Sequence, residues 1–305
     1  MAEHKITFGG YQPPASIHNR AAEIFGATLL EELGDSVDFT LTGNIIEQGH
    51  KAADLLTMVE SGDLSMCYFS TSYLADRVPE FALLDLPFVI EDRAQAYRIL
   101  DSALGTLLAE RLAAVSGFQV LGFWDNGFRH FSNRKHPIRT PADCEGLTLR
   151  TLFSDLHAEV FRLLGFEPIA LDVKDLLTAA ASGAVDAQEN PLTNTFNFGL
   201  HEHHPYITLS SHFFGAAALL CNRQQFESWQ APVRDAVREA VAKATLAQRQ
   251  FAADEDVTVL KKLVAAGIDI VSLTAEERNA FVATVAPVVE EQRRKFGDDL
   301  FRHFA

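Results

Sequence analysis

The sequence is poor in several residue types that define specialised protein classes. It has three cysteines, Cys67, Cys144 and Cys221, which can form at most one disulfide and match no CxxC or Cys/His zinc pattern. With 18 glycines and 11 prolines in 305 residues, it is neither collagen-like nor a low-complexity chain. Since 48% of its residues are hydrophobic, the composition predicts a globular protein with a substantial core.

Positive charge is also scarce. The chain has 26 basic and 41 acidic side chains, giving a formal net charge of −15 and a pI near 5.1. Such a surface repels phosphate backbones and anionic lipid, so we expect no nucleic-acid partner. No apolar run approaches the ~18 residues of a membrane span, and the N-terminus lacks the basic and apolar regions of a signal peptide. An exported protein whose signal has been removed has the same appearance.

The first 124 residues alternate between strand and helix patterns. Strands are predicted at 5–10, 37–42, 64–69 and 118–124, and helices from residue 16, at 52–60 and over much of 88–110. This alternation is typical of an α/β fold with a parallel sheet covered by helices on both faces.

The same alternation recurs after residue 128. Predicted strands at 147–151, 168–171 and 184–191 alternate with helices at 155–164 and 174–182, and an uninterrupted helix of about 50 Å is predicted over 232–264, followed by a strand at 267–273 and a helix from 274. No linker separates the two halves, so we expect the chain to cross between them more than once. The predicted lobes are therefore discontinuous: 1–124 with about 213–250, and 125–212 with about 251–305.

Two arginines and an asparagine lie where ligands collect in open α/β sheets, near strand ends. Arg150 and Arg129 offer planar donor forks that fit a carboxylate, and Asn190 precedes a proline at the end of its strand. Surface ion pairs to some of the 41 acids would explain the arginines equally well.

Catalytic and metal-binding motifs are not found. The sequence has no GxSxG, Walker A or HExxH pattern, and the histidines of His201-Glu-His-His-Pro lack the i, i+4 spacing of a zinc site, so a solvated loop is the better interpretation. We expect no cofactor and no bound metal. An α/β enzyme acting on a small carboxylic acid remains the alternative function, with Asp172 or His18 as its candidate base.

Four segments, in matching order and spacing, resemble the DctP-type solute-binding proteins of tripartite ATP-independent periplasmic (TRAP) transporters. They read VPEFALLDLPFV at 78–89, GFWDNGFRHFSN at 122–133, GLTLR at 146–150 and GAVDAQENPL at 183–192. The resemblance covers the chain from about residue 6 to the last helix. It implies a periplasmic-binding-protein-like fold, in which two α/β lobes joined by crossing strands and a long spanning helix close over an organic anion.

The resemblance also assigns roles and partners. Arg150 matches the family arginine that pairs with the ligand carboxylate, Arg129 matches an assisting arginine, and Asn190 matches an amide that orients the carboxylate. The protein is then expected to be a periplasmic monomer that delivers a small organic acid to membrane permease subunits.

One departure from the family pattern bears on the ligand. Many members have an aromatic residue before the helix that is predicted here from Lys174, whereas this chain has Asp172 and Val173 there. An Asp172 carboxylate that accepts ligand hydroxyls predicts a sugar acid, a uronate or an aldonate; otherwise a C4-dicarboxylate or another carboxylate is expected. Asp172 is equally interpretable as a helix N-cap. Weaker candidates, chosen only by their loop positions, are Tyr11, Gln12, His18, Phe69, Ser70, Thr71 and Phe153.

Overall fold

The computed structural model describes residues 3–304. Its strands are β1 (His4–Gly9), β2 (Val37–Thr42), β3 (Met66–Ser70), β4 (Phe118–Asn133), β5 (Thr148–Thr151), β6 (Glu167–Ala170), β7 (Ala187–Pro191), β8 (Tyr206–Asn222) and β9 (Asp269–Ser272). Its α-helices are α1 (Ile17–Leu33), α2 (Asp54–Ser61), α3 (Arg93–Leu100), α4 (Ala103–Val115), α5 (Asp155–Leu163), α6 (Val173–Ser182), α7 (Leu192–Asn197), α8 (Arg223–Ser228), α9 (Ala231–Ala265), α10 (Ala275–Phe296) and α11 (Asp298–Phe301).

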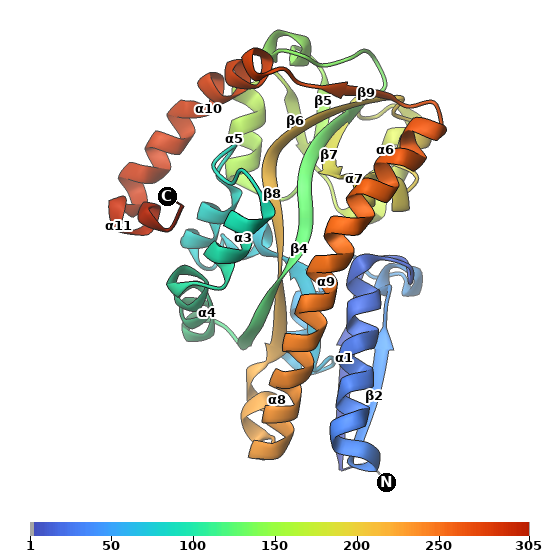
Figure 1. The fold of residues 1–305 in the computed structure, drawn as a ribbon, viewed down its shortest axis with the longest axis vertical. Coiled ribbons are helices and arrows are strands. Elements are labelled where there is room, and N and C mark those ends of the chain that lie inside the picture. The colour runs from blue at the N-terminus through green and yellow to red at the C-terminus, as the bar shows by residue number, and fades with distance from the viewer. Residues whose placement is uncertain (1–2, 305) are drawn as a thin grey trace.

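The strands form one mixed sheet in the order β2-β1-β3-β8-β4-β7-β5-β6. The remaining strand, β9, pairs in parallel with the first residues of β8, 206–209. The outer groups are parallel as predicted: β1 with β2 and β3, and β5 with β6 and β7. The predicted parallel arrangement does not extend to the centre, where the crossing strands β4 and β8 run antiparallel to each other through the length of the molecule (Figure 1). These two strands join the halves.

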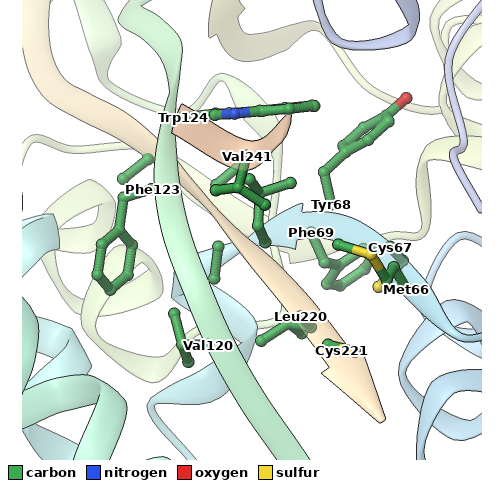
Figure 2. Close-up of a cluster of buried hydrophobic side chains, with 14 of the residues drawn as sticks. Met66, Cys67, Tyr68, Phe69, Val120, Phe123, Trp124, Leu220, Cys221 and Val241 are labelled. Carbon is green, nitrogen blue, oxygen red and sulfur yellow. The ribbon is translucent and has the colours of Figure 1, made fainter. Parts of the chain in front are cut away.

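Each half has its own hydrophobic core. The first surrounds β1, β3 and the adjoining parts of β4 and β8, and it includes the fully buried Trp124 (Figure 2). The second lies around β5, α5 and α10 and includes Phe131 and Phe161. The lobe boundaries stay a prediction, but Phe301 and Phe304 pack in the first core, because α10 carries the chain back toward it.

Helix α9 confirms the predicted long helix and spans both halves (Figure 1). Proline in its first turn costs no helical hydrogen bond, and Gly267, with φ of 82°, directly follows its end. Midway along the helix, the buried Gln248 amide accepts from the Asp125 backbone N–H (2.8 Å) and donates to the Asp125 carbonyl (2.5 Å). This pair of bonds fixes α9 to β4 between the two cores.

The sequence predictions were incomplete at the long strands. β4 continues nine residues past its predicted end at 124, and β8 was not predicted. Both are buried along most of their length, so they lack the polar–apolar alternation that marks a half-buried strand. In the segment 88–110, much of which was predicted to be helical, the first helix begins at Arg93. No helix within residues 3–304 is both long and apolar enough to cross a membrane.

Candidate functional site

A cavity lies between the two halves, beyond the ends of β1, β3, β5 and β7. It comprises about 380 Å³ of space unoccupied by protein atoms, which includes space open to solvent. Its lining residues are Tyr11, Ala52, Phe69, Ser70, Tyr73, Asn126, Arg129, Arg150, Leu152, Val173, Asn190, Asn194 and Phe198. Arg129, Arg150 and Asn190 are therefore brought together here. Arg150 and Asn190 lie near the ends of their strands as predicted, whereas Arg129 lies within the long strand β4.

Arg150 is a buried cation without a direct ion-pair partner among residues 3–304. Its side chain is 1% exposed, and its Nε and Nη2 both donate to the Leu171 carbonyl, at 2.9 and 2.6 Å. No carboxylate among residues 3–304 forms an ion pair with it, and Nη1 donates to no atom of this range. Burial lowers the pKa of Arg150, because the charged guanidinium has lost its hydration. This guanidinium is held in place with donor capacity left over at the cavity.

Arg129, in contrast, has a carboxylate partner. Its Nε donates to Glu189 Oε2, and its Nη2 donates to Glu189 Oε1 (2.9 Å) and to the Glu189 carbonyl (2.7 Å). Burial alone would lower the pKa of Arg129, but the Glu189 charge outweighs it and the pKa is raised. Arg129 therefore borders the cavity with its charge already compensated.

Glu189 is held from several sides. Its side chain is fully buried, the Thr151 hydroxyl donates to Oε1 (3.2 Å), and His212 Nε2 lies 3.4 Å from Oε2. Burial would raise the pKa of Glu189, but Arg129 and the side-chain hydrogen bonds hold it well below its usual range. The carboxylate thus stays ionised behind the cavity wall.

Three amides supply most of the neutral polar groups in the cavity wall. Asn190 Nδ2 donates to Gln188 Oε1 (2.5 Å), and Asn190 Oδ1 lies 3.5 Å from Arg129 Nη2. Asn194 Oδ1 accepts from Gln12 Nε2 (3.2 Å). The buried Oδ1 of Asn126 has no hydrogen-bond partner within residues 3–304, which leaves an acceptor free beside the cavity.

Of the candidates near the first and third strands, Tyr11, Phe69 and Ser70 line the cavity, whereas Gln12, His18 and Thr71 lie outside its lining. Gln12 reaches across to Asn194, His18 stacks on Tyr68 at a ring distance of 4.7 Å, and the Thr71 hydroxyl donates to the Ala216 carbonyl (3.2 Å). Loop position alone did not separate wall residues from those packed behind them.

The candidates around α6 and β5 also divide. Val173 lines the cavity, whereas Asp172 lies outside the lining. Asp172 caps α6 by accepting from the Lys174 backbone N–H (2.9 Å), which is the second of the two interpretations given for this residue. Phe153 is 49% exposed, outside the lining, with its ring 6.3 Å from that of Tyr73.

The cavity is closed by direct contacts between the halves. The Lys174 ammonium donates to the Gly49 carbonyl (2.5 Å), the Ala52 N–H lies 3.5 Å from Asp172 Oδ1, and the Gln12–Asn194 bond crosses the same gap. The structure is therefore that of a closed form.

Sequence reasoning missed Glu189, Asn126, Asn194, Tyr73 and Phe198. Glu189 and Asn126 lie inside the quoted motifs, one residue before Asn190 and three before Arg129. Strand alternation places residues at such odd separations on opposite faces, so it did not point to them. Tyr73 follows β3 in a short helical turn. Asn194 and Phe198, on and just after α7, have no comparable local signal.

Comparisons with known proteins agree with this geometry. Residues 8–295 match the family model of the DctP proteins, described as bacterial extracellular solute-binding protein, family 7. The 2,3-diketo-L-gulonate-binding periplasmic protein YiaO of Escherichia coli is 27% identical over 281 residues, which cover 92% of this chain and 84% of that protein.

Two solved structures share the fold over the full chain. The sugar acid binding protein of Advenella mimigardefordensis, in complex with galactonate, has a TM-score of 0.94 and 28% identity, covering 100% of this chain and 97% of that one. A TRAP periplasmic solute binding protein of Sulfurospirillum deleyianum with bound succinate has a TM-score of 0.93 and 27% identity, covering 100% and 99%. With the family match over nearly all residues, the chain belongs to the DctP family of TRAP solute-binding proteins, receptors for small acids.

Proposed function

We propose that this protein is the extracytoplasmic receptor of a TRAP transporter and binds a small organic acid through a pair between Arg150 and the ligand carboxylate. The observation that carries the proposal is the buried Arg150 guanidinium, which lines a closed cavity without an ion-pair partner among residues 3–304. A buried charge without a counter-charge is costly, and a ligand carboxylate supplies that charge with matching fork geometry.

The ligand we propose is a sugar acid, an aldonate or a uronate. The free acceptor of Asn126, together with Asn190, Asn194 and Tyr73, suits a ligand with several hydroxyl groups. The apolar part of the wall, which includes Phe69, Leu152, Val173 and Phe198, suits its carbon chain. The galactonate and 2,3-diketo-L-gulonate ligands of two relatives support the same class.

The working motion is opening and closing of the two halves about β4, β8 and α9. The contacts across the cavity, such as that between Lys174 and Gly49, stabilise the closed form, and the membrane permease receives the ligand when they break. Delivery is tested by measuring uptake of the bound acid in cells that carry the permease, with and without this protein.

Binding is tested by a thermal-shift screen of aldonates, uronates, C4-dicarboxylates, 2-oxo acids and aromatic acids, each beside its neutral analogue. Free ligand at 1,000 times its Kd stabilises the folded state by about 4 kcal/mol, which for a chain of this length raises Tm by roughly 6 °C. We expect this shift with sugar acids and not with their lactones or alditols. Equal shifts from an acid and its neutral analogue would contradict carboxylate recognition.

A further inference from the structure

The two arginines of the cavity differ in the group that balances their positive charge. Among the lining residues that the structure describes, only Arg129 and Arg150 carry a charge. Arg129 has a bidentate carboxylate partner in Glu189, and Arg150 has only a backbone carbonyl. The directions of their pKa values agree with this, since the pKa of Arg129 is raised and that of Arg150 is lowered. The cavity therefore offers one uncompensated positive charge.

The surrounding charges do not add a second one. Asp85 lies behind the wall, where it accepts from the Ser72 hydroxyl (3.1 Å) and lies 3.4 Å from His157 Nε2. Asp172 caps α6 close to Arg150. The nearby Lys174 ammonium is bound to the Gly49 carbonyl outside the lining. None of these groups therefore places a second unpaired cation at the cavity wall.

We propose that Glu189 sets the charge of the ligand: by neutralising Arg129 it leaves Arg150 as the one free cation, so the cavity accepts a monocarboxylate and rejects a dicarboxylate of the same carbon skeleton. The inference rests on the proposed function, in which Arg150 binds the first carboxylate. A second carboxylate in the closed cavity would find no free cation among the described lining residues, and its uncompensated burial would oppose binding. Glu189 acts through Arg129 and is a positioning residue.

Matched ligand pairs test the proposal on the wild-type protein. D-galactonate and galactarate, D-gluconate and D-glucarate, and D-erythronate and meso-tartrate each share a carbon skeleton and differ only in whether one end is a hydroxymethyl or a carboxylate group. We expect calorimetry at pH 7.5 to give a Kd at least about 100-fold lower for the monocarboxylate of any pair that binds. A dicarboxylate that binds as tightly as its partner overturns the inference while leaving acid binding intact.

Substitution of Glu189 tests its own role. Glu189→Gln keeps the side-chain shape and frees the Arg129 charge, so the preference for the monocarboxylate should fall at least tenfold. Glu60→Gln is the matched control, because Glu60 also binds an arginine bidentately, Arg77 at 2.5 and 2.7 Å, but outside the cavity lining. The double variant Arg129→Gln with Glu189→Gln removes both charges and should keep the preference.

The outcomes separate the two proposals. An unchanged preference in a folded Glu189→Gln protein overturns the role of Glu189. If that variant does not fold, loss of the preference in the double variant does the same, since it leaves the net charge of the cavity unaltered. Failure of the acids in all three pairs and of the uronates to bind the wild type overturns the sugar-acid ligand and the inference built on it. Equal binding of both members of a pair overturns only the inference about charge.

Discussion

Replacing Arg150 gives the most direct test of carboxylate recognition. In Arg150→Ala, a ligand carboxylate would enter a closed cavity whose other arginine is occupied by Glu189. Leaving one partner of a buried ion pair uncompensated costs about 3 to 5 kcal/mol, so Kd should rise by roughly 150-fold to several thousand-fold. The fold should persist, since Arg150 packs at the cavity wall and bonds only to the Leu171 carbonyl.

Arg150→Lys separates charge from geometry. Nε and Nη2 of Arg150 hold Leu171 while Nη1 remains free, whereas a single ammonium cannot both hold that carbonyl and present two parallel donors to a carboxylate. Loss of a charged hydrogen bond costs about 2 kcal/mol, which predicts a Kd roughly 30-fold higher than that of the wild type.

Isothermal titration calorimetry with the best acid of the ligand screen measures both effects. Arg302→Ala is the control, because Arg302 forms an exposed ion pair with Asp299 outside the cavity lining and its loss should leave Kd unchanged. Circular dichroism and the melting temperature establish that each variant is folded. A folded Arg150→Ala protein whose Kd lies within threefold of the wild type would refute the assignment of Arg150 as the carboxylate ligand.

Three further substitutions test the surrounding structure by urea unfolding. Asp172→Ala removes the N-cap of α6 and should destabilise the protein by about 1 kcal/mol, with less than a tenfold rise in Kd; a much larger loss of affinity would restore a ligand role for Asp172. Gln248→Ala leaves both the N–H and the C=O of Asp125 unpaired and should cost about 2 to 3 kcal/mol, whereas the exposed Gln250→Ala should cost almost nothing; equal losses would contradict the clamp between α9 and β4. Burial lowers the pKa of His18 to about 3, so protonation favours the unfolded chain, in which histidine titrates near 6.5, and stability should fall from pH 6.5 toward pH 5 by up to about 1.4 kcal/mol per unit for this residue. His18→Phe should make this slope shallower, and an unchanged slope would exclude His18 as its source.

The parts of the fold predicted from the sequence are those with strong local signals. The helical periodicity around α1 and α5, the long helix α9 with proline at its start, and the parallel groups at both ends of the sheet were all evident. The central strands were not, since β8 is an almost wholly buried segment and β4 continues through Gly127, whose φ of 97° accompanies a register shift against β8. Buried strands lose the period-2 pattern because both faces contact apolar neighbours.

The site shows the same division. Arg150 and Asn190 could be placed at one cleft because the ends of strands in an α/β sheet gather functional residues, whereas Arg129 reaches the same cavity from within β4. Sequence position could not tell that Gln12, His18 and Thr71 turn away from the cavity, or that Val173 rather than its neighbour Asp172 faces it. Those outcomes depend on side-chain directions that only packing against distant elements fixes.

The sequence by itself determined the class of the protein through the alternation of strands and helices and four motifs in order, two of which contain the cavity arginines. Tertiary structure alone decided what each arginine is free to do. Arg129 and Glu189 are 60 residues apart in the chain and become partners only because β4 and β7 pair, whereas β5 places Arg150 against a backbone carbonyl. The charge that a cavity offers is the sum over neighbours in space, and this sum exists only after the chain has folded.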